Sequence, residues 1–118
     1  MTIQRFQVGK RLSGAVVHNG VVYVAGQVPD ESAGPDAGKQ TESVLAKIDQ
    51  LLREAGSDKS RILSAQIFLP DMADFAAMNA AWEKWIPQGQ TPARATIEAG
   101  LANAAYKVEI MCVAAQGK

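Results

Sequence analysis

The chain alternates between short runs with apolar side chains at every second position and two longer segments with apolar side chains at every third or fourth position. The first spacing predicts β-strands and the second predicts amphipathic helices. Strands are expected at residues 4–8, 12–17, 21–25, 62–69, 91–99 and 106–114, and helices at residues 40–55 and from Asp71 to the residues before Pro87. This order of elements predicts an α+β fold in which two helices cover one face of a mostly antiparallel sheet.

Turn and cap residues mark the ends of several elements. Asn19-Gly20 separates two apolar runs and predicts a type I′ hairpin, because both central residues of that turn need a positive φ. Gly56 follows the last apolar position of the first helix and predicts its C-terminal stop. Asp71 predicts the N-cap of the second helix. The segment 28–39, rich in Gly, Pro, Asp and Ser, predicts a surface loop.

The strand at residues 91–99 carries the most distinctive side chains. Alternation places small apolar side chains on one face and Arg94, Thr96 and Glu98 on the other. If the following loop folds straight back, this strand pairs antiparallel with the last strand, and Glu109 lies opposite Thr96 or Arg94. Two interpretations stay open: an anion-binding arginine with an acid/base partner, or a structural ion pair.

Several predicted strands are apolar on both faces, as in residues 21–25 and 108–113. Two helices can cover only one face of such a sheet. A homo-oligomer with its sheets turned inward would cover the other face. A site at the sheet's edge would then lie near a subunit boundary, where ligand pockets are common.

Composition narrows the class of protein. The 118 residues suffice for one domain, residues 1–118. Twelve basic and twelve acidic residues give a net charge of zero, which supports neither a nucleic-acid partner nor an electrostatic membrane anchor. Cys112 is the single cysteine, so no internal disulfide forms and a reducing compartment is expected. With no apolar signal core at the start and no apolar run of membrane length, we expect a cytoplasmic protein.

Few residues are candidates for chemistry. His18, the single histidine, is interpreted as a solvated turn residue, and the aromatic and methionine side chains of the second helix as core. One His and one Cys cannot build a soft metal site, and no phosphate-binding or dinucleotide motif is present, so neither metal nor cofactor is expected. What remains is Arg94 with Glu109, Gly26 where backbone can approach a ligand, and Asn79 on an apolar helix stripe. An arginine fork suits one carboxylate, so the expected ligand is a small carboxylic acid.

A set of short motifs runs in order along the whole chain. The set comprises Leu12-Ser13-Gly14-Ala15-Val16, Ala25-Gly26-Gln27, Gln40-Thr41, Phe75, Asn79, Trp82, Pro92-Ala93-Arg94-Ala95 and Val108-Glu109-Ile110. By these motifs the chain resembles the RidA/YjgF family, the reactive-intermediate imine deaminases. The resemblance implies a single RidA-like domain with a chorismate-mutase-like α+β fold, assembled as a homotrimer with three clefts between subunits.

The resemblance also implies a function in metabolite damage control. Enzymes of this kind hydrolyse 2-aminoacrylate and related imines to 2-keto acids and ammonia without a cofactor. By the resemblance, Arg94 would hold the substrate carboxylate, Glu109 would position or activate the attacking water, and Gly26 and Asn79 would line the pocket. The alternative is a non-catalytic trimeric binder of small carboxylates, such as a metabolite sensor. The zero net charge disfavours RNA cleavage, another activity associated with the family.

Three positions depart from the family's pattern. Leu12 stands where well-studied members carry tyrosine, Ala25 where they carry serine and Thr96 where they carry cysteine. The resemblance places all three at the substrate pocket. Because these side chains make the pocket wall more apolar, we expect a bulkier or more apolar imine as substrate.

Overall fold

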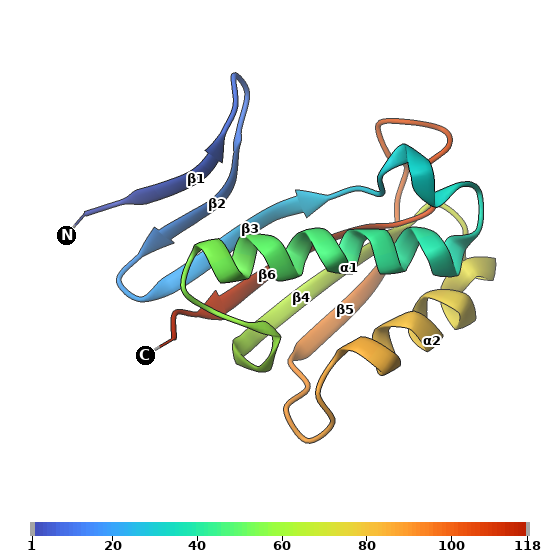
Figure 1. Ribbon diagram of the computed structural model, residues 1–118. Coiled ribbons are helices and arrows are strands. Elements are labelled where there is room, and N and C mark those ends of the chain that lie inside the picture. The colour runs from blue at the N-terminus through green and yellow to red at the C-terminus, as the bar shows by residue number, and fades with distance from the viewer. Residues whose placement is uncertain (1, 118) are drawn as a thin grey trace.

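The computed structural model describes residues 2–117 and consists of one mixed sheet with its α-helices on a single face (Figure 1). The strands are β1 (Gln4–Val8), β2 (Ser13–His18), β3 (Val21–Gln27), β4 (Ile62–Leu69), β5 (Ala93–Glu98) and β6 (Glu109–Ala115), in the sheet order β1-β2-β3-β6-β4-β5. The α-helices are α1 (Ala37–Glu54) and α2 (Phe75–Trp85), and three short 3-10 helices are η1 (Glu31–Ala33), η2 (Lys59–Arg61) and η3 (Met72–Asp74). The predicted α+β fold is confirmed.

The predicted pairing of the last two strands is wrong. β5 pairs with β4 in parallel, and β6 pairs antiparallel with both β3 and β4, so β4 separates β5 from β6. The physical reason is that β4, α2 and β5 form a βαβ unit, in which the helix returns the chain to the end where β4 began. Residues 99–108 therefore form a crossover past β4 and not a hairpin turn.

The predicted hairpin turn and the predicted stop of the first helix take the expected conformations. Asn19 and Gly20 have φ values of 53° and 75°, as a type I′ hairpin requires. Gly56 has a φ of 82°, and the N–H groups of Gly56 and Ser57 donate to carbonyls of the last helical turn at 3.2 and 2.7 Å. This pattern is a Schellman motif, which ends α1. The prediction for the start of the second helix is wrong in its residue: Asp71 caps η3, which leads directly into α2, and the N-cap position of α2 itself is Asp74.

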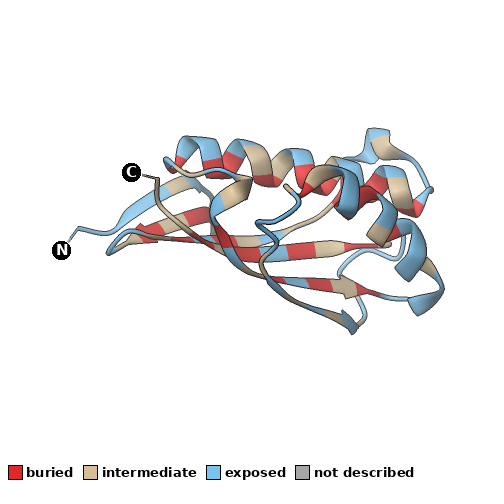
Figure 2. Cartoon of the chain, turned by 90° about the horizontal axis from the view of Figure 1, so that it is seen from below, coloured by how far each residue is buried: buried red, intermediate tan, exposed pale blue. Residues whose placement is uncertain are grey.

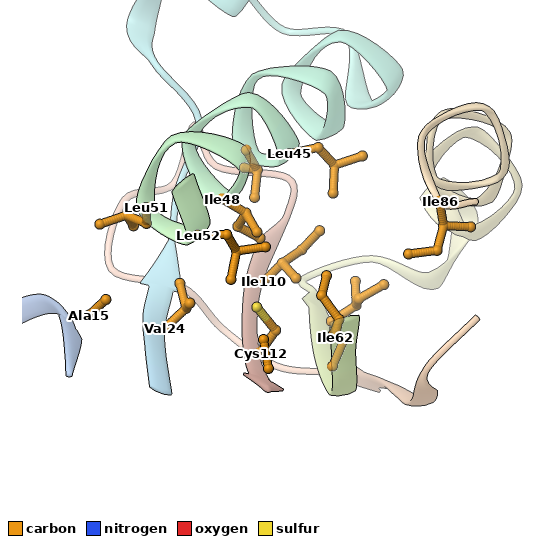
Figure 3. Close-up of a cluster of buried hydrophobic side chains, with 14 of the residues drawn as sticks. Ala15, Val24, Leu45, Ile48, Leu51, Leu52, Ile62, Ile86, Ile110 and Cys112 are labelled. Carbon is orange, nitrogen blue, oxygen red and sulfur yellow. The ribbon is translucent and has the colours of Figure 1, made fainter. Parts of the chain in front are cut away.

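The hydrophobic core lies between the two helices and one face of the sheet (Figures 2 and 3). From α1 it takes Val44, Leu45, Ile48, Leu51 and Leu52, and from the sheet mainly Ala15, Val17, Val22, Val24, Ile62, Ala65, Ile67, Leu69, Ile110, Cys112 and Ala114. In α2 the buried side chains are Met78, Ala81 and Trp82. The expectation that all large side chains of the second helix are core is wrong for Met72 and Phe75, which are exposed: Met72 lies in η3 and Phe75 is the first residue of α2, before the turns that pack on the core.

No helix among residues 2–117 covers the opposite face of the sheet (Figure 2). Tyr23, Leu63, Ile97 and Met111 are all exposed there, between 36% and 53%. A hollow of about 420 Å³ lies over β4, β5 and β6. The strands are therefore apolar on both faces, as expected, while the homotrimer itself stays a prediction. Among the described residues, no helix combines the length and apolar character needed to cross a membrane.

Candidate functional site

Arg94 lies on the helix-covered side of the edge strand β5. Its backbone pairs with Ala65, a buried residue of β4 that faces the core, so its side chain points toward α2. The guanidinium carbon lies 5.4 Å from the centre of the Trp82 ring. Arg94 and Trp82 line a hollow of about 320 Å³ together with Asn79, Glu83, Ile86, Gln88, Thr91 and Pro92.

The guanidinium is partly withdrawn from water. Burial lowers the pKa of Arg94, and the nearby Glu83 carboxylate opposes that shift. Arginine nevertheless stays charged throughout the physiological range. With the Trp82 indole next to it, the guanidinium can still offer N–H groups to a carboxylate as a bidentate fork. The arrangement therefore suits recognition of a single small carboxylate.

Asn79 lines the same hollow as Arg94. It is half-buried on α2, one helical turn before Trp82. Its side-chain amide offers both donors and an acceptor next to a fixed positive charge. Such a pair can bind a carboxylate and orient a neutral polar group beside it. That Asn79 contacts a ligand stays a prediction.

Glu109 lies on the other face of the sheet, at the first position of β6. It pairs with Phe68, and its neighbour Ile110 is fully buried under the helices, so Glu109 points to the open face. A register shift in β3 between Val24 and Gln27 places Gly26 beside it. A Cβ built on Gly26 collides with a Glu109 carboxylate oxygen and lies 3.0 Å from the carboxyl carbon. Gly26 thus allows close backbone approach, here to the Glu109 carboxyl group.

Arg94 and Glu109 do not meet within one chain, contrary to the sequence-based prediction. Glu109 of β6 pairs with Phe68 of β4, and Phe68 pairs with Ile97 of β5, so Glu109 is level with Ile97 two strands away. Arg94 lies three residues from Ile97 along β5. These offsets separate the two positions by about 10 Å across the sheet and about 10 Å along it. The two side chains also point to opposite faces. An intrachain ion pair is therefore ruled out, and both groups can act on one ligand only if they come from different copies of the chain.

The three residues that depart from the family pattern lie in two places, Ala25 and Leu12 next to or level with the Gly26 region and Thr96 on the face of Arg94. Ala25 is half-buried next to Gly26. Leu12 comes just before β2 and is 63% exposed. Ala15 of β2 pairs with Val24 of β3, and if this register continues by three residues, Leu12 is level with Gln27. Thr96 shares the face of Arg94, and its hydroxyl oxygen is buried without a hydrogen-bond partner.

Sequence reasoning missed Glu83 as a neighbour of Arg94. No local pattern marks it, because its place depends on how α2 crosses from β4 to β5. Trp82 is part of the core, as predicted, and its ring also faces the Arg94 guanidinium carbon at 5.4 Å. No group of three or more His, Cys, Asp or Glu side chains within residues 2–117 is arranged to hold a metal ion.

The sequence profile of the endoribonuclease L-PSP family matches residues 2–116. The chain belongs to this family, which includes the YjgF and RidA proteins. The endoribonuclease L-PSP match spans nearly the whole chain and confirms the resemblance seen in the motifs.

Two curated members of the endoribonuclease L-PSP family are about half identical to this chain. The RutC family protein YoaB of Escherichia coli is 51% identical over 115 residues, covering 98% of this chain and 99% of YoaB. A RutC family protein of Haemophilus influenzae is 50% identical over 114 residues, covering 97% and 98% of the two chains. A solved YjgF-family structure from Neisseria meningitidis superposes with a TM-score of 0.97 at 45% identity, covering 100% of this chain and 98% of that one.

Proposed function

We propose that this protein is an enamine/imine deaminase that hydrolyses reactive 2-imino acids of the 2-aminoacrylate type to 2-keto acids and ammonia. The observation that carries the proposal is a pair of complementary half-sites. Arg94 and Asn79 offer a carboxylate-binding fork and an amide in one hollow. Glu109 offers a carboxylate held against the backbone of Gly26. Membership of the YjgF/RidA family supports the same function.

Arg94 supplies orientation in this mechanism. Its fork binds the substrate carboxylate through two parallel N–H···O bonds and fixes the adjacent imine carbon. An imine is already electrophilic, so placing it correctly relative to water removes a large share of the barrier. Asn79, in the same hollow, holds the substrate in a single orientation.

Glu109 moves the protons. Its carboxylate accepts a proton from water as the water oxygen bonds to the imine carbon and the carbon–nitrogen double bond becomes a single bond. It then returns that proton to the nitrogen, which gives a carbinolamine. In a second transfer the carboxylate takes the hydroxyl proton and passes it to the nitrogen as the carbon–nitrogen bond breaks, so that ammonia leaves and the hydroxyl group becomes the carbonyl of the 2-keto acid. General acid/base catalysis of this kind contributes about 10²–10⁴-fold.

The complete site forms between copies of the chain. Arg94 and Glu109 lie on opposite faces of one sheet, so a ligand that touches both needs a second copy. The exposed apolar side chains of the open face offer a surface for that contact. We propose a homotrimer with three clefts, each taking Arg94 from one copy and Glu109 from another.

The preferred substrate has a larger or more apolar side chain than 2-aminoacrylate. Ala25 precedes Gly26 and Leu12 is level with Gln27, so both would add apolar surface and no hydroxyl group near Glu109. Thr96 lies on the Arg94 side. An added methylene group in such a pocket changes binding by about 1–3 kcal/mol, which gives a measurable preference among imines.

The test is release of ammonia and keto acid from a panel of imines generated in situ by an amino-acid oxidase. Wild type should accelerate release, with a preference for larger apolar side chains. Arg94→Ala should not accelerate it. Arg53→Ala is the matched control, because Arg53 is exposed in the last turn of α1, and it should keep wild-type activity. Equal rates with and without wild-type protein for every imine would sink the proposal.

The alternative is a trimeric carboxylate binder without catalysis. It also uses Arg94, so the two functions are distinguished at Glu109. In a deaminase, Glu109→Gln abolishes turnover, whereas in a binder it leaves the affinity for a small 2-keto acid nearly unchanged and there is no turnover to lose. Preserved turnover in Glu109→Gln would contradict the proposed proton transfer.

RNA cleavage, which the family's name suggests, is not the expected activity of this chain. Its twelve basic residues are balanced by twelve acidic ones. RNA binding normally depends on a basic surface and weakens steeply with salt. We expect no salt-dependent binding of RNA, measured between about 50 and 200 mM salt.

A further inference from the structure

Gln40, in the first turns of α1, is almost completely buried, at 3% exposure. Its amide nitrogen donates to the carbonyl oxygens of Gly34 at 2.9 Å and Ala105 at 3.0 Å. Its amide oxygen accepts from the backbone N–H of Lys107 at 2.7 Å. Both donors are therefore in use, and the acceptor is bonded as well. A buried amide satisfied in this way holds its partners firmly in place.

The partners of Gln40 belong to two segments that flank the contact between Gly26 and Glu109. Gly34 lies in the segment that follows β3, the strand that contains Gly26. Ala105 and Lys107 lie in the crossover 99–108, and Lys107 is two residues before Glu109. Figure 1 shows this crossover and η1 next to each other near the N-terminal end of α1. One side chain thus joins the backbone leading away from Gly26 to the backbone leading into Glu109.

Two other polar residues follow Gln40 along α1 at helical spacing. Ser43 accepts from the N–H of Asp30 at 2.9 Å, and Lys47 donates to the carbonyl of Val28 at 2.7 Å. Ser43 and Lys47 therefore form hydrogen bonds only to the segment after β3. Gln40 differs because it also forms hydrogen bonds to the crossover, at Ala105 and Lys107.

We propose that Gln40 is a positioning residue for Glu109. It fixes the last residues of the crossover, so that β6 begins in the register that presses the Glu109 carboxyl group against Gly26. The inference rests on the proposed deaminase function. It predicts that disturbing Gln40 impairs the water-activating half of the site and leaves the carboxylate-binding half, with Arg94 and Asn79 on the other face, intact.

The first test separates kcat from KM. Gln40→Met keeps the length of the side chain and removes all three hydrogen bonds, so Glu109 shifts. A displacement of about 1 Å lowers kcat by up to about 100-fold, and KM should change less than about twofold because Arg94 is untouched. Gln116→Met is the matched control, since Gln116 donates to the Ala55 carbonyl at 3.0 Å near the opposite end of β6. It should keep wild-type kcat. Equal losses in both variants would overturn the proposal.

A second variant keeps the proposal testable if Gln40→Met fails to fold. In Gln40→Glu the ionised carboxylate still accepts from Lys107 but faces the carbonyl oxygens of Gly34 and Ala105 without a donor. Burial raises the pKa of the introduced carboxyl group, and its protonated form regains one donor. The activity of Gln40→Glu relative to wild type should therefore rise as pH falls. A constant ratio across pH would count against the positioning role.

A third measurement does not depend on turnover. The carbon-13 chemical shift of the Glu109 carboxyl carbon, at fixed pH, should move in Gln40→Met and stay unchanged in Gln116→Met. If wild type hydrolyses no imine, the proposed function fails, and this shift alone decides the role of Gln40. An unchanged Glu109 signal in a folded Gln40 variant would overturn the inference.

Discussion

Gly26 carries no side chain, and the carboxyl group of Glu109 occupies the place of its Cβ. Gly26→Ala should therefore displace Glu109 and lower turnover by about 100-fold. The effect on stability should stay within about 1 kcal/mol, because the atoms in the way are the far end of an exposed-face side chain that can turn aside. Imine hydrolysis and urea unfolding measure the two effects.

Gly100→Ala provides the control for that substitution. A Cβ on Gly100, in the crossover, has no neighbouring atom within 4 Å, so it displaces no side chain. It should keep both activity and stability. If Gly26→Ala also kept full turnover, the assignment of Glu109 as the proton-transfer group would be wrong.

The free energy of unfolding should depend on pH through the buried thiol of Cys112. Burial raises the pKa of its thiol to about 12, whereas a thiol in an unfolded chain has a pKa of about 8.5. The neutral thiol is thus favoured in the folded state, and its contribution is complete below about pH 8.5 and lost as pH rises toward 12. Across that window the free energy of unfolding should fall by up to about 1.4 kcal/mol per pH unit more in wild type than in Cys112→Ala. Parallel curves for the two proteins would contradict this assignment.

At the level of elements, the C-terminal stop of α1 depends on one backbone conformation. Gly56 has a φ of 82°, which costs other residues about 1–2 kcal/mol. A Cβ there would meet Gln116 only at ordinary contact distance, 3.5 Å, so the cost is conformational and not steric. Gly56→Ala should lower the free energy of unfolding by about 1–2 kcal/mol, measured by urea unfolding. A loss no larger than that of Gly100→Ala would argue against the Schellman motif as a stabilising feature.

The sequence predicted the elements well because each carries its own local signal. Asn19-Gly20 and Gly56 act within a few residues of the chain, and the structure confirms both. Asp71 also acts locally, but it caps η3 and not α2. The partner of β5 has no such local signal. The order strand, helix, strand over β4, α2 and β5 is itself typical of a parallel βαβ unit, and that signal could have corrected the prediction.

The sequence named the candidate residues singly, and their roles stay predictions, but it did not give their arrangement. The structure brings Asn79 to Arg94 and Gly26 to Glu109, and the second contact comes from the pairing of β3 with β6. The relation between Arg94 and Glu109 depends on β4 lying between their strands, which no spacing along the chain reveals. The hydrogen bonds of Gln40 were missed for the same reason, because Lys107 lies 67 residues away in sequence.

For the whole molecule, the central feature is a sheet with one covered face and one open face (Figure 2). Arg94 belongs to the covered face and Glu109 to the open one. Within one chain, Arg94 and Glu109 therefore cannot contact the same small molecule, and under the proposed function each would form half of a site. Association of several copies, which would also bury the exposed Tyr23, Leu63 and Met111, would bring unlike half-sites together.

The most direct test of this account mixes two inactive variants, Arg94→Ala and Glu109→Gln. Co-expressed with different affinity tags and purified through both, they yield assemblies that contain each variant. In a cyclic trimer whose sites are shared between neighbours, every mixed assembly holds one site with both native residues, and so about one third of wild-type activity returns. Mixed assemblies that stay as inactive as the two parent variants, while wild type hydrolyses imines, would contradict a site shared between copies.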